Sequence, residues 1–272
     1  MITWWNYQIK TDISLLHRGL NLADGHFTTL MVLNGAIINW EYHKKRLAKG
    51  CLLLGLVQPN WQKLSDHLSD YVFEDVAISC YRVTLLRSDP QRGYRGKWNV
   101  PCDIQITLFM YPDKYFSWIE SGINLKRSYH TLSQNYILAG IKTLSRTEQV
   151  VLSADLEDDN YQDVLLLDRQ DHVIETSNSN IFFRYKQCLY TPALGYSGIT
   201  GTMRQVVLSL ASDLNLSVYV IDISYKTLAR FAECFITNSL LGVVSVNVID
   251  NTVYRDTQCA RRLRSIIFKG QL

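Results

Sequence analysis

The alternation of hydrophobic and polar residues predicts strands in the first part of the chain, interrupted by two amphipathic helices. Residues 1–40 read as strands, and Asn34-Gly35 between two apolar runs predicts a hairpin with a type I′ turn. Apolar side chains then recur at helical spacing in two stretches, the first of which ends at Gly55. The predicted helices are 41–54 and 61–71, and the strands that follow are 76–86 and 104–110, joined by a polar loop over 87–101.

The second part of the chain again mixes strands and helices, after an interruption at 111–114 that contains Pro112. Its predicted strands are 164–167, 172–176, 181–184, 188–190, 218–223, 233–237 and 243–249, and its predicted helices are about 202–214 and 260–268. The interruption is the expected domain boundary. We therefore expect an α/β (α+β) fold with a smaller N-terminal domain at 1–112, a connecting segment at 113–122 and a larger C-terminal domain at 123–272.

The stretch 138–150 predicts a turn followed by a helix. An extended entry leads to a turn at Gly140, and Ser145 is expected to cap the helix, with Glu148 at the capping-box spacing. The expected apolar stripe of this helix begins with Val150, Val151 and Ala154.

Lys142 stands between that turn and that helix, flanked by Ile141 and Leu144. A lysine among apolar neighbours is a candidate imine-forming amine, because desolvation disfavours the ammonium form and leaves a nucleophile. A lone lysine is more often a surface residue with a buried stem. The interpretation of Lys142 therefore depends on what else the chain carries.

A glycine-rich turn, Gly198-Ile199-Thr200-Gly201, leads directly into a predicted helix. Glycines allow close approach to the backbone, the helix N-terminus favours an anion, and Thr200 adds a hydroxyl donor, so the turn is a candidate phosphate cradle. Glycines before a helix are more often plain loop geometry. Further candidate donors are Asn238 and Ser239 after a strand, and Arg46 on the first helix.

Glu175 projects from a short, mostly apolar strand. Such a carboxylate either faces solvent or pairs with a buried cation, and a protonated pyridine nitrogen is a cation of this kind. An amine, a phosphate cradle and an acid for a ring nitrogen are together the protein's share of pyridoxal-phosphate chemistry.

Composition and charge exclude several other classes. Apolar residues make up 47% and charged residues 19% of the 272 residues, which is typical of a soluble globular protein. The net charge of +3 argues against nucleic acid and anionic membrane as partners, and no apolar run is long enough for a membrane span. The six cysteines and six histidines lack metal-ligand spacing, so we expect buried free thiols, no metal site and, without a visible secretory signal, a cytoplasmic protein.

Over nearly its whole length the chain resembles the fold-type IV pyridoxal-phosphate enzymes, and among them the 4-amino-4-deoxychorismate lyases. The segments that carry the resemblance are Asp24-Gly25-His26-Phe27-Thr28-Thr29, His43-Lys44-Lys45-Arg46-Leu47, Ala139-Gly140-Ile141-Lys142 running on to Arg146-Thr147-Glu148-Gln149-Val150, Glu175-Thr176 with Asn180-Ile181-Phe182, and Gly198-Ile199-Thr200-Gly201 with Met203-Arg204. No single segment is specific, whereas their order along the chain is.

The resemblance implies roles for individual residues. Lys142 matches the lysine that holds pyridoxal 5′-phosphate as a Schiff base, and Glu175 matches the acid that faces the pyridine nitrogen. The residues that match the phosphate site are Arg46, Ile199, Thr200, Asn238 and Ser239. The resemblance also implies two domains with the cofactor in the interdomain cleft, usually in a homodimer.

The reaction implied by the resemblance is conversion of aminodeoxychorismate to 4-aminobenzoate and pyruvate, a step of folate biosynthesis. Thr28-Thr29 stands where related aminotransferases often carry a glutamate, which favours the lyases. Two positions depart from the lyase pattern, Arg95 after Tyr94 and Ser145 after the lysine. The candidate substrate contacts are Thr28, Thr29, Arg92, Tyr94 and Arg204.

Two alternatives stay open. An aminotransferase for D-amino or branched-chain amino acids uses the same cofactor contacts, so the cofactor motifs do not exclude it. A binding protein that has kept the fold and lost the chemistry is the other alternative, and the joint presence of Lys142 and Glu175 argues against it.

Overall fold

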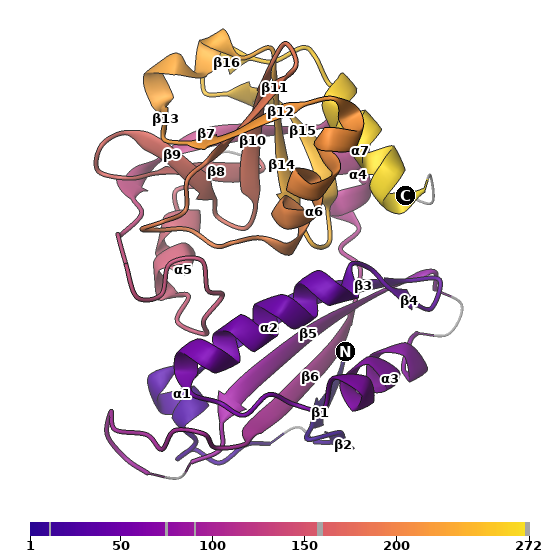
Figure 1. Ribbon diagram of the computed structural model, residues 1–272, viewed down its shortest axis with the longest axis vertical. Coiled ribbons are helices and arrows are strands. Elements are labelled where there is room, and N and C mark those ends of the chain that lie inside the picture. Colours follow the sequence, from indigo (N-terminus) through magenta and orange to yellow (C-terminus); the bar gives the residue numbers. More distant parts are fainter. Residues whose placement is uncertain (11, 74–75, 90, 157–159, 270–272) are drawn as a thin grey trace. The chain divides into compact units, whose positions relative to one another are not determined.

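The computed structural model describes residues 1–10, 12–73, 76–89, 91–156 and 160–269, and in it the chain forms two compact units (Figure 1). The smaller unit comprises Met1–Tyr111 and Ile141–Ser145, and the larger comprises Pro112–Gly140 and Arg146–Leu272. The sequence-based ranges place all of 123–272 in one domain, so they differ from these units at Ile141–Ser145. Within the described ranges, no helix is long and apolar enough to cross a membrane.

The smaller unit is an antiparallel sheet with helices. In the part of the chain described, its six strands lie in the order β2-β1-β6-β5-β3-β4. They are β1 (Ile2–Trp5), β2 (Gln8–Ile9), β3 (Gly25–Leu33), β4 (Ala36–Ile37), β5 (Ile78–Arg87) and β6 (Cys102–Met110), and the helices are α1 (Arg18–Leu22), α2 (Trp40–Leu54) and α3 (Trp61–Asp70). Helix α2 runs across one face of the sheet (Figure 1), and Leu30 and Val32 of β3 share a buried core with Leu47 of α2 and Leu64 of α3.

Two local predictions in this unit are confirmed. Asn34 and Gly35 have φ angles of 49° and 78°, as a type I′ turn requires, and Val32 pairs with Ile37 across it. Helix α2 ends at Gly55, whose φ of 62° is the left-handed conformation that a glycine adopts without strain.

The prediction of strands throughout 1–40 is wrong at Arg18–Leu22, which forms α1. The His17 side chain accepts a hydrogen bond from the Gly19 amide and so caps this short helix. Histidine is not a usual N-cap residue, and the apolar pattern of so short a segment does not separate a helix from a strand.

The larger unit is built on a mixed sheet. Among its described residues, ten strands pair in the order β12-β11-β10-β14-β15-β7-β8-β9-β13, with β16 beside β15. Its elements are α4 (Lys114–Ser121), β7 (Ile123–Thr131), α5 (Thr147–Ser153), β8 (Asp163–Leu167), β9 (His172–Thr176), β10 (Asn180–Tyr185), β11 (Cys188–Pro192), α6 (Thr202–Leu210), η1 (Ser212–Leu214), β12 (Ser217–Ile221), β13 (Ile223–Ser224), η2 (Tyr225–Arg230), β14 (Glu233–Asn238), β15 (Gly242–Ile249), β16 (Thr252–Val253) and α7 (Gln258–Phe268).

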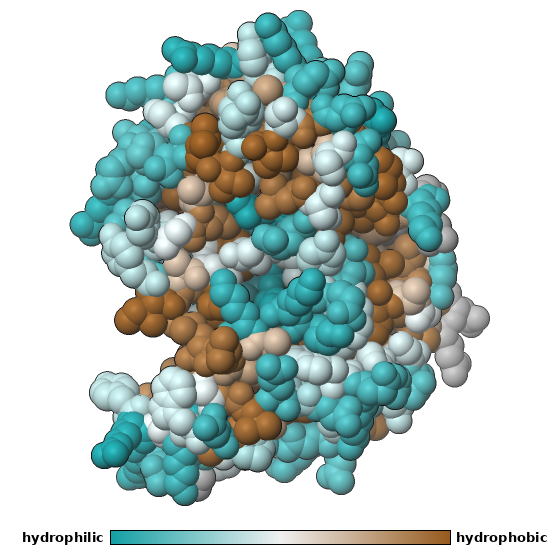
Figure 2. Space-filling view, in the orientation of Figure 1, coloured by the Kyte–Doolittle hydropathy of each residue, from teal (hydrophilic) through white to brown (hydrophobic). Residues whose placement is uncertain are grey.

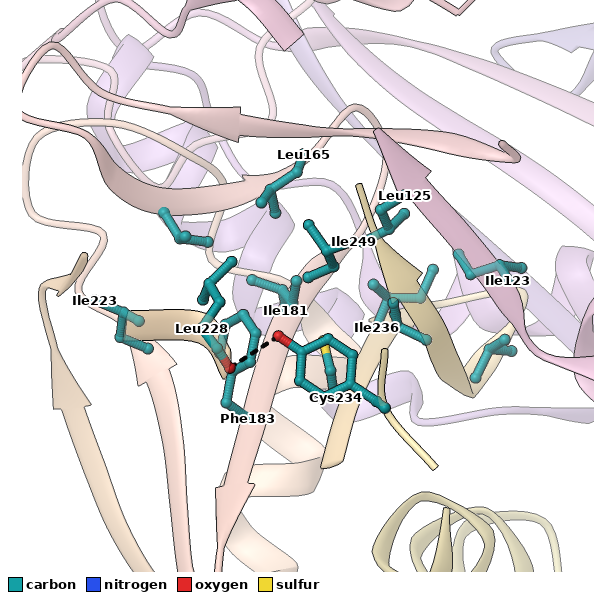
Figure 3. Close-up of a cluster of buried hydrophobic side chains, with 14 of the residues drawn as sticks. Ile123, Leu125, Leu165, Ile181, Phe183, Ile223, Leu228, Cys234, Ile236 and Ile249 are labelled. Atoms are coloured by element: carbon teal, nitrogen blue, oxygen red, sulfur yellow. Dashed lines mark hydrogen bonds between the residues drawn. The ribbon is translucent and has the colours of Figure 1, made fainter. Parts of the chain in front are cut away.

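Two apolar clusters hold this sheet together. In the first, Leu125, Leu165 and Ile236 meet from three different strands, and the Tyr254 hydroxyl donates to the Leu228 carbonyl at 3.1 Å (Figure 3). In the second, the rings of Phe182 and Phe235 stack with centroids 5.1 Å apart and pack beneath residues of α6 and α7. Strands β8, β10 and β14 contain apolar runs in the sequence because the sheet buries them on both faces.

Several element boundaries differ from the predictions. The expected connecting segment 113–122 contains helix α4, and the expected extended entry at 138–139 lies in a turn. The helix predicted to run from about Thr202 to Leu214 ends at Leu210 and continues as the short η1. The strand predicted at 218–223 divides into β12 and β13.

The helix predicted after Lys142 is α5, and its first residue is Thr147. Arg146 stands at its N-cap position, so Ser145 is not the N-cap. The Glu148 carboxylate accepts a hydrogen bond from the amide of Ser133 at 2.7 Å. The predicted apolar stripe is also wrong, since Val150 and Val151 are 67% and 53% exposed. Hydrophobic residues reach the surface elsewhere too, as brown patches between polar ones in Figure 2.

The prediction of free thiols is confirmed for all six cysteines. Burial is complete only for some of them: Cys102 and Cys188 are half-buried.

Candidate cofactor site

In the smaller unit, the segment that carries Lys142 lies along strand β3. The Phe27 amide donates to the Lys142 carbonyl at 2.9 Å, the Leu144 amide donates to the Gly25 carbonyl at 3.0 Å, and His26 and Thr143 form an antiparallel bridge. This pairing fixes the backbone of the lysine. The half-buried Lys142 side chain places its Nζ atom 4.9 Å from the centre of the Phe27 ring.

The opposite face of β3 packs against helix α2 and contains Thr28. Thr28 is fully buried, and its hydroxyl lies 2.7 Å from Nδ1 of His43. Burial, together with the positive charge of Arg46 on the same helix, lowers the pKa of His43 to about 3. The Thr28 hydroxyl thus joins β3 to α2, while Thr29 is half-buried. The substrate contacts expected of both threonines stay predictions.

Arg92 and Tyr94 lie in the polar loop after β5, where both are exposed. The Tyr94 side chain is 94% exposed. The loop backbone is held in place, because Nη1 of Arg18 donates to the carbonyls of Gln91 and Gly93 at 2.8 and 2.7 Å. The loop therefore presents these two side chains outward from a fixed backbone.

In the larger unit, Glu175 of β9 is buried and surrounded by donors. Its Oε2 accepts hydrogen bonds from the Ile199 amide at 2.9 Å and from Nδ2 of Asn180 at 3.2 Å. Burial lowers the pKa values of Arg146 and Arg204, and in both cases the negative charge of Glu175 opposes that shift. Glu175 thus lies among hydrogen-bond donors and close enough to two guanidinium groups to affect their pKa values.

The glycine turn after β11 packs against this acid. Gly198 has a φ of 79°, and a side chain there would come within 2.9 Å of Ile174. A Cβ atom on Gly201 would lie 2.0 Å from Oδ1 of Asn180. Glycine at these two positions therefore allows the turn to approach Glu175 and Asn180 closely.

The same turn is paired with the residue that precedes the lysine segment. The Gly140 amide donates to the Gly198 carbonyl at 2.9 Å, and the Thr200 amide donates to the Gly140 carbonyl at 3.2 Å. Ile199 and Thr200 are expected to contact a phosphate through backbone and hydroxyl, and their amides donate to Glu175 and to the Gly140 carbonyl. Their contact with a phosphate stays a prediction.

Asn238 is the last residue of β14, which pairs with the strand of Asn180, and Ser239 follows it. The Asn238 side chain accepts from the Leu240 and Leu241 amides at 3.0 and 2.8 Å and donates to the Ser179 hydroxyl at 3.0 Å. Asn238 therefore shapes the turn in which Ser239 lies.

Buried polar atoms in this region fit a polar ligand. Thr237 stands opposite Asn180 in the strand register, and its buried hydroxyl has no hydrogen-bond partner among the described residues. Arg204 donates from Nη2 to the Pro192 carbonyl at 3.1 Å, while its buried Nε also lacks a partner within those ranges. Such atoms are rare in folded proteins and are often explained by a ligand or ion.

Sequence reasoning gave no role to Asn180 or Arg146, although both belong to the segments that carry the family resemblance. Asn180 reaches Glu175 across a tight turn, five residues away in sequence, and reaches the Ile199 carbonyl nineteen residues away. The short spacing in sequence could have indicated the contact with Glu175. The contact with Ile199 depends on tertiary structure.

Comparisons with known proteins extend this description. The family model for class IV amino-transferases matches residues 25–249. An aminodeoxychorismate lyase from Vibrio harveyi is 30% identical over 246 residues, which cover 90% of each chain. A probable branched-chain-amino-acid aminotransferase from Rickettsia felis is 32% identical over 286 residues, covering 96% of this chain and 94% of its own.

Solved structures give the same result for the fold. The crystal structure of 4-amino-4-deoxychorismate lyase from Pseudomonas aeruginosa superposes with a TM-score of 0.91 over 99% of both chains, at 26% identity. A hypothetical aminotransferase from Mycobacterium tuberculosis in its PLP-bound form matches with a TM-score of 0.84 at 17% identity, which shows the fold alone.

The predicted fold type is confirmed by these matches. The expected cofactor agrees with the family, whose enzymes depend on pyridoxal phosphate. Since the family model spans most of the sequence and the fold is shared over its whole length, the chain belongs to the class IV aminotransferase family, the fold-type IV enzymes.

Proposed function

We propose that this chain is a pyridoxal-phosphate-dependent lyase that converts 4-amino-4-deoxychorismate to 4-aminobenzoate and pyruvate, acting as a homodimer. The observation that carries the cofactor assignment is the buried Glu175 carboxylate, held by the Ile199 amide and by Asn180 beside the glycine turn. A buried acid of this kind suits a protonated ring nitrogen.

Lys142, Glu175 and the cofactor have different roles in the proposed reaction. The bound cofactor supplies an electron sink for the carbon that bears the substrate amine. Lys142, once its amine is free, removes the proton from that carbon, and Glu175 keeps a proton on the ring nitrogen. The carbon–oxygen bond to the enolpyruvyl group then breaks, the substrate ring becomes aromatic, and Lys142 returns its proton to the leaving group, which is released as pyruvate.

The relatives of this chain include both lyases and probable aminotransferases. The lyase from Pseudomonas aeruginosa matches over 99% of both chains, and the lyase from Vibrio harveyi matches over 90%. The aminotransferase from Rickettsia felis is as similar in identity, so an aminotransferase is the second candidate.

The deciding experiment incubates purified protein with each substrate set. With aminodeoxychorismate alone we expect pyruvate and 4-aminobenzoate in equal amounts, because the elimination needs no second substrate. With a branched-chain or D-amino acid and 2-oxoglutarate we expect no glutamate. Glutamate formation without pyruvate release would replace the lyase by the aminotransferase.

The cofactor assignment has its own test. Purified protein incubated with pyridoxal phosphate should absorb near the visible edge, and borohydride should fix the label on the peptide that contains Lys142. The Lys142→Ala variant should lose this absorbance and turnover together, since no other lysine is expected to form the imine. A colourless wild-type protein would favour a binding protein that has lost the chemistry.

A further inference from the structure

We infer that Asn180 is a positioning residue that joins the acid for the ring nitrogen to the glycine turn. This inference rests on the proposed function, since it concerns how the chain holds pyridoxal phosphate. Sequence reasoning gave Asn180 no role, and its side chain is 5% exposed.

The Asn180 amide group has two hydrogens, and each has an acceptor. One acceptor is Oε2 of Glu175, at 3.2 Å from Nδ2, and the other is the Ile199 carbonyl, at 2.8 Å. The Ile199 amide in turn donates to the same Oε2 of Glu175 at 2.9 Å. Three groups thus form a closed triangle, in which the acid cannot turn without breaking a bond to Ile199 or Asn180.

The triangle is also held from the side of the turn. Oδ1 of Asn180 lies where a Cβ on Gly201 would intrude, so the side chain fills the space that the glycine leaves. Gly140 is hydrogen-bonded to Gly198 and Thr200 on either side of Ile199. Asn180 therefore connects Glu175 to a turn whose backbone is already fixed.

The consequence is that loss of Asn180 should act through Glu175. A carboxylate that loses a donor and its fixed orientation interacts less well with a cation. The contribution of the ring nitrogen to cofactor binding should then fall, while contacts elsewhere on the cofactor persist. A purely structural role would weaken all contacts alike.

The experiment measures dissociation constants of two compounds for the apoprotein. One is pyridoxal phosphate, and the other is its analogue with carbon in place of the ring nitrogen, which has no N–H to pair with Glu175. Wild-type protein should bind the analogue more weakly. The measured quantity is the dissociation constant of the analogue divided by that of pyridoxal phosphate. In Asn180→Ala this ratio should shrink by on the order of tenfold, which corresponds to the loss of one hydrogen bond to a charged group.

Two further variants keep the test decisive. Asn180→Asp preserves size and places a second carboxylate against Glu175, so it should lose the discrimination as well. Gly201→Ala changes the turn instead of Asn180. Its Cβ atom should displace the Asn180 side chain, so the ratio should shrink in this variant too. The matched control is Asn247→Ala, which removes an amide donor to the Ser121 carbonyl at 2.8 Å, and its ratio should equal that of wild type.

The outcomes separate this inference from the proposed function. If wild type discriminates between the compounds and the folded Asn180 variants discriminate equally, the role of Asn180 is wrong while the cofactor assignment stands. If the wild-type protein binds neither compound, both the role of Asn180 and the cofactor assignment are wrong. Urea unfolding of each variant shows whether it is folded under the conditions of the titration.

Discussion

At the scale of single residues, the burial of Glu175 decides what that side chain can do. An ionised carboxylate that is 4% exposed is stable only with hydrogen-bond donors or cations around it. Ile199 and Asn180 supply donors, and Arg146 and Arg204 supply positive charge. The acid is therefore fixed in place by hydrogen-bond donors and lies near positive charge, and a carboxylate in such surroundings suits a protonated ring nitrogen.

Substituting Glu175 by glutamine tests this role. A neutral amide does not hold a proton on the ring nitrogen, so we expect kcat to fall by roughly a hundredfold, as when other preorganised electrostatic contacts are removed. Cofactor binding should persist through the phosphate. Turnover and a pyridoxal-phosphate titration measure the two effects, with the exposed Glu120→Gln as control. Undiminished turnover in Glu175→Gln would remove the residue from the proposed role.

Two buried histidines in the smaller unit predict how stability depends on pH. Burial lowers the pKa of His26 to about 4, and burial with the charge of Arg46 lowers that of His43 to about 3. Both are neutral in the folded protein, whereas in the unfolded chain they bind protons below about pH 6.5. Unfolding therefore takes up protons below that pH, and stability falls as the pH decreases from about 6.5 towards 4.

The expected loss at pH 5 is about 2 kcal/mol for each histidine, relative to pH 7.5. Urea unfolding at a series of pH values measures it. His26→Gln removes one of the two groups, so its stability should change about half as steeply over this range. An equal slope in the variant and the wild type would show that His26 does not contribute.

At the scale of elements, one carboxylate immediately before β3 anchors the exposed loop that carries Arg92 and Tyr94. Oδ2 of Asp24 accepts from Nε of Arg18 and from Nε of Arg87, both at 2.8 Å. Arg18 reaches two loop carbonyls, and Arg87 donates to the carbonyls of Lys97 and Leu54. The carboxylate thus balances two buried guanidinium groups that hold the loop.

Asp24→Asn should destabilise the protein by about 3 kcal/mol, because it leaves two buried cations without their shared anion. Urea unfolding at pH 7.5 measures the change. The control is Glu41→Gln, which removes only the exposed pair with Lys44 and should stay within about 0.5 kcal/mol of wild type. Equal stabilities of the two variants would contradict the anchoring role.

The same scale shows which elements the sequence could and could not predict. The Asn34-Gly35 hairpin and the end of α2 at Gly55 were predictable because a left-handed backbone is a local requirement of one or two residues. The helix start after Lys142 was predicted one residue early, because its N-cap position is Arg146 and not Ser145. A capping pattern in the sequence locates the end of a helix only to within one or two residues.

Some features of the candidate site could likewise be predicted from the sequence, and others could not. Lys142 and Glu175 could be proposed from sequence because their chemistry follows from residue type and neighbours. The hydrogen bond of Thr28 to His43 and the double contact of Asn180 could not, because each depends on how separate elements pack. Both concern residues that position others, and such residues have no chemical signature of their own.

At the scale of the whole molecule, the residues predicted to hold the cofactor are spread along the sequence from Arg46 to Ser239. An unfolded chain holds such distant segments in no fixed geometry, so a ligand that needs several of them binds the folded chain only. A ligand that binds only the folded state stabilises it by an amount set by its concentration relative to the dissociation constant. Cofactor binding must therefore appear as added stability of the fold.

Pyridoxal phosphate at a hundred times its dissociation constant should stabilise the apoprotein by about 2.7 kcal/mol, or roughly 5–10 °C in Tm for a chain of this size. Thermal unfolding with and without the compound measures the shift. Pyridoxal without its phosphate, at the same concentration, should give a much smaller shift, because the phosphate contacts are missing. Lys142→Ala should keep part of the shift, since the phosphate and Glu175 contacts do not depend on the amine. Equal shifts for both compounds would show that the predicted phosphate residues do not bind the phosphate, even if Lys142 reacts with the aldehyde.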